Sequence, residues 1–155
     1  MAQTGYESLP TGRRAHFPKP KFVRLCTVME KDFDRWNEEK KTTNAESARF
    51  YTVREIWWRR LGVNVGSEQD GNGELFLRPV VIVRSFGAHT CLILPLTTSA
   101  QKHPLRIPVG EVQGKSASAI MSQMRVIDTR RLVEKIGFLD KDIFTTLRKK
   151  ARMLF

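Results

Sequence analysis

The sequence predicts a mainly β protein, a small and strongly bent β-barrel accompanied by two helices. Short apolar segments rich in β-branched residues recur between glycine-containing links from residue 52 onward. A pattern of helical period follows Asp140 and closes the sequence. A third segment, rich in helix-favouring residues, precedes the strands at 29–41. Several short strands with glycine turns and one terminal helix are typical of a small barrel.

The clearest strand runs over 79–84 and reads Pro-Val-Val-Ile-Val-Arg. The short link 85–89 joins it to a second apolar strand over 90–95, which predicts a β-hairpin. Alternation of side chains favours an earlier strand over 52–58. Further short strands are predicted at 105–109, 117–121, 124–127 and 131–137.

The predicted C-terminal helix begins after Asp140, whose carboxylate can cap the first turn. Helical spacing places five apolar side chains on one face: Ile143, Phe144, Leu147, Ala151 and Leu154. This face is expected to pack against the barrel.

Before the barrel domain, which we place at 51–155, the sequence divides into two parts. Residues 1–22 are rich in proline and glycine and predict a flexible basic tail. Residues 23–50 predict a helical extension, with an extended piece at 22–27 and a helix at 29–41. The helix has a narrow apolar stripe, Phe33 and Trp36, which favours packing at the edge of the barrel.

The chain is strongly basic, with 27 Lys and Arg against 16 Asp and Glu, a net charge of +11 and a pI near 10.2. Most of the excess lies in residues 102–155, where twelve basic residues face five acidic ones, a net charge of +7. Such a charge indicates a polyanionic partner, most commonly nucleic acid. The alternative is a basic face that only water solvates.

The cysteines and histidines indicate neither a disulfide nor a metal site. Cys26 and Cys91 are far apart and belong to no Cys-x-x-Cys pair, which predicts buried thiols in a reducing cytoplasm. The three histidines stand alone, without ligand spacing. Residues 1–22 lack the apolar core of a signal peptide, and no apolar segment has membrane-spanning length. We therefore expect a cytoplasmic protein without metal, cofactor or membrane contact.

The predicted strands present cations and hydroxyls near one rim. Arg78 directly precedes the strand at 79–84, and Thr97 and Thr98 follow the strand at 90–95. Guanidinium and hydroxyl groups are donors that suit phosphate oxygens. A long glycine-containing loop over 62–77 precedes this region, and loops of that length are usually functional. The pattern points to RNA.

Four segments in this order resemble the MazF/PemK family of toxin endoribonucleases from bacterial toxin–antitoxin pairs. They are Gly-Ser-Glu-Gln at 66–69, Arg-Pro-Val-Val-Ile-Val at 78–83, Pro-Leu-Thr-Thr at 95–98 and Gln-Met-Arg-Val-Ile-Asp at 123–128. The resemblance covers roughly residues 52–154. It implies an SH3-like barrel of the CcdB/PemK type, a homodimer, and neutralisation by a cognate acidic antitoxin.

The resemblance also implies an activity and a set of residues. Such enzymes cut single-stranded mRNA without a metal, because the ribose 2′-hydroxyl attacks the adjacent phosphate and leaves a 2′,3′-cyclic phosphate and a 5′-hydroxyl. Arg78 matches the family's catalytic arginine and Thr97 its threonine. Predicted RNA contacts are Ser67, Glu68, Gln69, Thr98, Ser122, Gln123 and Arg125.

The chain also departs from the family pattern. Ser122 stands where members often have an acidic residue, and Ser67 stands where some have a histidine. The identity of the general acid and base is therefore open, and Glu68 and Asp70 are the residues that could take their place. A non-catalytic module of the same barrel remains the alternative; it would bind RNA or protein, as a gyrase poison or a degenerate toxin would.

Overall fold

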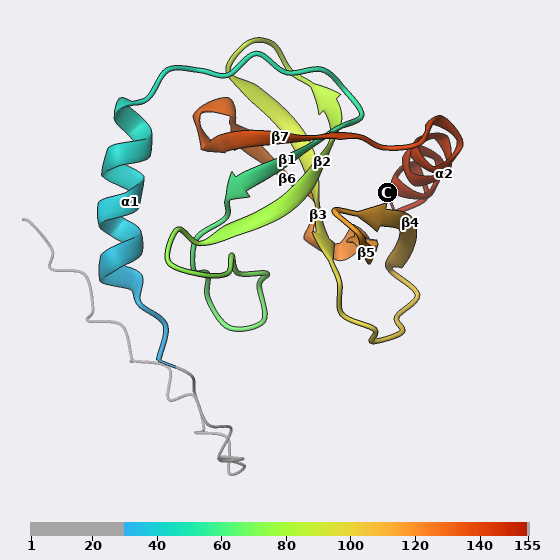
Figure 1. Cartoon of the computed structure of the whole chain (residues 1–155), viewed down its shortest axis with the longest axis horizontal. Helices are drawn as coiled ribbons and strands as arrows, with labels where there is room; N and C mark the ends of the chain where they lie inside the picture. The colour runs from blue at the N-terminus through green and yellow to red at the C-terminus, as the bar shows by residue number, and fades with distance from the viewer. Residues whose placement is uncertain (1–29, 155) are drawn as a thin grey trace, which may run out of the picture. The chain divides into compact units, whose positions relative to one another are not determined.

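Seven antiparallel strands form a curled sheet in the computed structural model, which describes residues 30–154 (Figure 1). This confirms the predicted mainly β class with a helix at each end. The sheet order is β4-β5-β3-β2-β1-β7, and β6 pairs with β3 off this path. The strands are β1 (Glu55–Arg60), β2 (Leu77–Ser85), β3 (Thr90–Thr97), β4 (Arg106–Val112), β5 (Lys115–Ile120), β6 (Arg125–Asp128) and β7 (Leu132–Phe138).

Strands β2 and β3 form the centre of the sheet and are buried on both faces. Val80, Val81 and Ile82 are fully inaccessible to solvent. Alternate side chains of β2 enter two separate apolar clusters, one containing Val81 and the other Val80. Strand β3 pairs with three neighbours, β2, β5 and β6, so the residues near its ends are held by paired strands.

The first strand begins three residues later than predicted. Arg54 has a φ of 81°, in the left-handed region, and the amide of Glu55 donates to Thr52 O in a turn. The turn keeps residues 52–54 out of the sheet, and the strand continues instead to Arg60.

Helix α2 (Lys141–Arg152) closes one side of the sheet as predicted. The carboxylate of Asp140 accepts hydrogen bonds from the amides of Asp142 and Ile143 at 2.9 and 3.1 Å, so it is the N-cap. Phe144, Leu147 and Ala151 are buried in the larger apolar cluster. Leu154 lies beyond the helix and is 40% exposed, so its predicted place on the buried face is wrong.

Helix α1 (Phe33–Ala45) lies beside the sheet, on the side away from α2 (Figure 1). The helix begins after its N-cap Asp32, and the predicted first residue, Met29, lies outside the described residues. The predicted end at 42–44 is wrong, because Thr42 bonds the carbonyl of Glu38 inside the helix and the chain turns extended only at Glu46.

Helix α1 packs on the barrel through Trp36, which is 6% exposed, whereas Phe33 is 49% exposed. The indole covers Gly62, which has a φ of 84°, so closely that a Cβ at this position would collide with the ring. Only glycine both adopts this positive φ readily and leaves room for the indole ring. Near its C-terminal end the helix meets the short 3₁₀ turn η2 (Thr129–Arg131).

The predicted tail at 1–22, the extended piece at 22–27 and Cys26 all lie outside the described residues. Cys91 is fully buried, as expected, and burial raises the pKa of its thiol to about 11. The helices of the described part are all too short or too polar to cross a membrane.

Candidate functional site

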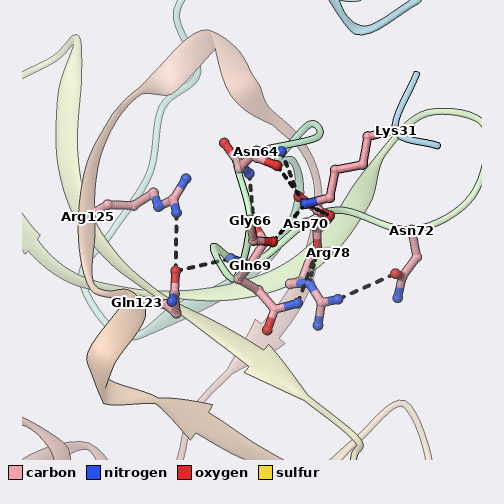
Figure 2. A network of polar contacts seen from close by, with 9 residues as sticks. All are labelled: Lys31, Asn64, Gly66, Gln69, Asp70, Asn72, Arg78, Gln123 and Arg125. Atoms are coloured by element: carbon pink, nitrogen blue, oxygen red, sulfur yellow. Dashed lines mark hydrogen bonds and ion pairs between the residues drawn. The ribbon is translucent and has the colours of Figure 1, made fainter. Parts of the chain in front are cut away.

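Arg78 lies near the start of β2 with its guanidinium held by three acceptors, and Figure 2 shows two of them, Asp70 and Asn72. Its Nε donates to the backbone oxygen of Asp70 at 2.6 Å, and its Nη1 donates to that of Leu96 at 3.2 Å. Its Nη2 donates to Asn72 Oδ1 at 3.4 Å. Arg78 is 8% exposed, and burial lowers its pKa while the charge of Asp70 raises it. Because a guanidinium keeps its proton in proteins, the site holds a fixed cation.

The register of β2 and β3 brings Arg78 and Thr97 together. Val80 pairs with Pro95, and Arg78 and Thr97 are each two residues beyond that pair. Continuing the register places them opposite each other on one face of the sheet. Both line a cavity of about 750 Å³, and Thr98 lines it too. This is the juxtaposition of guanidinium and alcohol that the sequence predicts.

Four of the predicted RNA contacts gather in a second, smaller pocket. Its volume is about 180 Å³, and its lining includes Ser67, Gln69, Ser122 and Gln123. Arg106 and His103 complete the polar wall. The predicted site residues therefore fall into two neighbouring groups rather than one.

The loop between β1 and β2 connects the two groups. The amide of Gln69 donates to Gln123 Oε1 at 3.1 Å, and Arg125 Nη2 donates to the same oxygen at 3.4 Å (Figure 2). The next loop residue, Asp70, accepts the bond from Arg78. One short loop segment thus lies over the predicted catalytic arginine and is bound to the predicted RNA-contact strand.

Glu68 is not brought together with the other predicted residues. It is exposed and lines a different pocket, against Phe33, Trp36 and Lys40 of α1. Its carboxylate therefore lies apart from the cavity that contains Arg78 and Thr97.

The loop is anchored by Lys31, which precedes α1. Its Nζ forms an ion pair with Asp70 Oδ2 at 2.8 Å and donates to the backbone oxygens of Asn64 and Gly66 at 2.6 and 3.1 Å (Figure 2). The amide of Asn64 donates to the other carboxylate oxygen, Asp70 Oδ1, at 2.6 Å. Both oxygens of Asp70 are thus engaged, which leaves it poorly placed to accept a substrate proton.

The sequence analysis missed three residues of this site: Lys31, Asn72 and Glu134. Asn72 stands between Gly71 and Gly73, and its side-chain oxygen accepts the bond from Arg78. The Gly-Asn-Gly segment, which is typical of a turn, is the sequence pattern that could have indicated Asn72. Glu134 is the one carboxylate among the residues that line the 750 Å³ cavity. It is in register with Trp58, which pairs with Pro79, so its side chain lies on the sheet face opposite to that of Arg78 and lines the cavity from that side. Nothing in the sequence distinguishes Lys31 or Glu134 from other charged surface residues.

In the part of the chain that the structure describes, His, Cys, Asp and Glu form no group of three or more that could hold a metal ion.

Solved structures of known proteins share the fold of this chain. A crystal structure of MazF from Deinococcus radiodurans matches 70% of this chain and 97% of its own, at 20% identity and a TM-score of 0.54. A MazE–MazF structure from the same organism matches 68% of this chain and 96% of its own, at 18% identity and a TM-score of 0.52. At such identities the likeness concerns the fold, and it confirms the PemK-type barrel that the sequence resemblance implied.

No curated protein is significantly similar to the chain. Residues 52–155 match the family model described as PemK-like, MazF-like toxin of type II toxin–antitoxin system. The match covers about two thirds of the sequence, including both groups of predicted site residues. The chain therefore belongs to the PemK-like, MazF-like toxins of type II toxin–antitoxin systems.

Proposed function

We propose that this protein is a toxin endoribonuclease that cuts single-stranded RNA, mRNA in particular, without a metal ion. The observation that carries the proposal is the meeting of Arg78 and Thr97 at one cavity, across paired strands. In the proposed reaction the ribose 2′-oxygen bonds to the adjacent phosphorus as the bond to the 5′-oxygen breaks. The products are a 2′,3′-cyclic phosphate and a 5′-hydroxyl.

Arg78 supplies the positive charge for this step. Its planar fork suits two non-bridging phosphate oxygens, whose negative charge grows in the transition state. Thr97 adds a hydroxyl that can donate to a phosphate oxygen but is too weak a base to remove the 2′-proton.

Glu134 is our candidate for that base, because it is the carboxylate that shares the cavity with Arg78. Ser122 and Ser67 line the other pocket and cannot titrate near neutral pH. On this proposal the 2′-proton passes to Glu134, and a proton from solvent reaches the departing 5′-oxygen.

The loop restrains Arg78 but does not use all of its donors. Of the five N–H groups of a guanidinium, three donate to Asp70, Leu96 or Asn72, which leaves one on each terminal nitrogen. A phosphate in the cavity that Arg78 lines can therefore bind these two N–H groups while the loop keeps its own contacts.

We further propose a cytoplasmic homodimer that a cognate acidic antitoxin neutralises. The net charge of +11 favours an acidic partner that lies along the basic surface. MazF of Deinococcus radiodurans has been solved together with MazE, which makes a similar complex a reasonable expectation for this chain.

The test is cleavage of a single-stranded RNA by the purified protein in EDTA, with the product ends identified by mass spectrometry. We expect a cyclic phosphate end, and Arg78→Ala should lower kcat/KM by about a hundredfold, as for loss of one transition-state donor. Arg84→Ala is the matched control, since Arg84 is an exposed arginine near the other end of β2.

Burial of Arg78 under the loop favours one alternative, a binding module that holds RNA without cutting it. Tight RNA binding with intact RNA in every buffer would establish that function and exclude the nuclease.

A further inference from the structure

A second cationic pocket lies between α1 and η2, outside the site described above. Its volume is about 530 Å³, and four cations line it: Lys40, Lys41, Arg130 and Arg131. The carboxylate in the lining, Asp128, is already paired with Arg130 at 2.8 Å. Lys41 is also paired, with Glu38 at 2.7 Å, and the pocket keeps a positive charge from the remaining cations.

The pocket also holds hydrogen-bonding capacity that the protein does not use. Thr43 is 6% exposed and lines the pocket, yet its hydroxyl has no hydrogen-bond partner in the structure. A buried hydroxyl without a partner costs about 1–3 kcal/mol.

A buried arginine on β1 adds to the positive charge of this region. Arg59 is 1% exposed, and its Nε and Nη1 have no hydrogen-bond partner. It pairs with Leu132, the residue after Arg131. Burial, then the charges of Arg131 and Arg125, lowers its pKa well below the usual value. An uncompensated buried cation is expensive, and an anion nearby would offset part of that cost.

The same arginine connects the pocket to the proposed catalytic site. Arg59 on β1 pairs with Arg78 on β2, so their side chains share one face of the sheet. Arg59 also pairs with Leu132 on β7, the residue after Arg131. Arg131 lines the pocket and stacks over the indole of Trp36 at 5.5 Å. The pairing of the strands thus links Arg78 through Arg59 to the segment that borders the pocket.

We propose that the pocket between α1 and η2 is a second anchoring site for RNA, which holds a phosphate group of the strand away from the bond that is cut. The proposal rests on the proposed function and adds a site built partly by α1, which lies outside the matched toxin family region. A strand with regularly spaced phosphates suits a group of cations. An acidic peptide suits it less, because peptide sites need apolar anchors and Trp36 is the one large apolar residue in the lining.

The test uses a fluorescent single-stranded RNA of about twelve nucleotides, 2′-O-methylated throughout so that it cannot be cut. Lys40→Gln with Lys41→Gln removes two pocket cations. Lys149→Gln with Lys150→Gln removes the same charge from an exposed part of α2 and is the control. We expect about tenfold weaker binding for the pocket variant, less than about twofold for the control, and a salt dependence that is shallower by about one phosphate contact or more.

Cleavage of the unmodified RNA adds a second readout. Because the pocket does not touch the reacting atoms, the pocket variant should raise KM and leave kcat unchanged. Shortening the RNA stepwise from each end should remove the difference between variant and wild type once the strand no longer reaches the pocket. Unchanged thermal unfolding would show that both variants are folded.

Three results would contradict the proposal or its basis. Equal losses of RNA affinity in the pocket variant and the α2 control would show that the pocket acts only through the general charge of the surface. Unchanged RNA binding with weakened binding of an oligoglutamate peptide would assign the pocket to an acidic protein segment. A wild-type protein that neither cuts nor binds RNA would overturn the proposed function itself.

Discussion

Arg78 and Arg59 are cross-strand neighbours on one face of the sheet, yet their hydrogen bonding is opposite. Each kind of nitrogen in the Arg78 fork has a protein acceptor, whereas Nε and Nη1 of Arg59 have none. The first cation is held by the loop and keeps one N–H on each terminal nitrogen for a ligand in the cavity that it lines. The second is 1% exposed, so its unpartnered charge is a cost to stability. The comparison separates a loop-held site from a buried, unsatisfied cation.

The largest expected effect tests the loop-held site. Arg78→Lys should lower the rate of RNA cleavage nearly as much as Arg78→Ala, about a hundredfold, because an ammonium cannot make the bidentate contact. Single-turnover kinetics at saturating RNA measures this. Arg84→Lys should leave the rate unchanged. A lysine variant within about threefold of wild type would mean that charge alone matters and the fork does not.

The next effect tests the unsatisfied site. Arg59→Met should stabilise the protein by about 2 kcal/mol, because an apolar side chain replaces a buried cation without partners. Urea denaturation with an unchanged m-value measures it. Arg60→Met is the control, since Arg60 Nη1 bonds Glu46 Oε1 at 2.8 Å, and it should destabilise by about 1 kcal/mol. Destabilisation by both variants would show that Arg59 has a partner after all.

The loop over Arg78 should open more often without its anchor. Lys31→Ala removes the ion pair to Asp70 and two bonds to loop carbonyls, so hydrogen exchange at the amides of Asn64 and Gly71 should accelerate about tenfold. Lys41→Ala, which removes only an exposed pair with Glu38, should not change it. Equal exchange in both variants would mean that the loop is held without Lys31.

The smallest effect concerns acid stability beside the α1–η2 pocket. Hydrogen bonds from Arg130 lower the pKa of Asp128 from 3.8 to about 2. A lowered folded-state pKa adds stability above the unfolded value, and this is lost as the pH falls from about 3.8 toward about 2. Over that pH window the free energy of unfolding of Asp128→Asn should therefore fall by about 1 kcal/mol less than that of the wild type. The difference is small because solvent weakens this partly exposed ion pair. Parallel stability curves for the two proteins would contradict the assignment.

The sequence predicts the sheet well and the contacts across it poorly. Val80–Ile82 are buried on both faces, so their continuous β-branched run needs no tertiary information to be read as a strand. Arg78 and Thr97 stay a prediction as catalytic residues, although both line one cavity where β2 and β3 pair. The start of β1 could not, since the left-handed Arg54 depends on the turn that Glu55 closes.

The site's remaining parts depend on partners far away in the sequence. Lys31 bonds residues 33 and 35 positions later, and no local pattern reveals that. The burial of Arg59 is equally invisible, because an arginine on a strand normally reaches solvent. The end of α1 was misjudged since Thr43 is buried against the barrel, where packing overrides its weak helix propensity.

The bare backbone of Gly62 beneath the Trp36 ring has a consequence for engineering this toxin. The loop that covers Arg78 begins at this glycine, and the same glycine seats the added helix. A grafted loop with any other residue at this position would place a side chain against the Trp36 ring and push the helix away. Loop and helix must therefore be exchanged as one module, and specificity designed into either will change with the other.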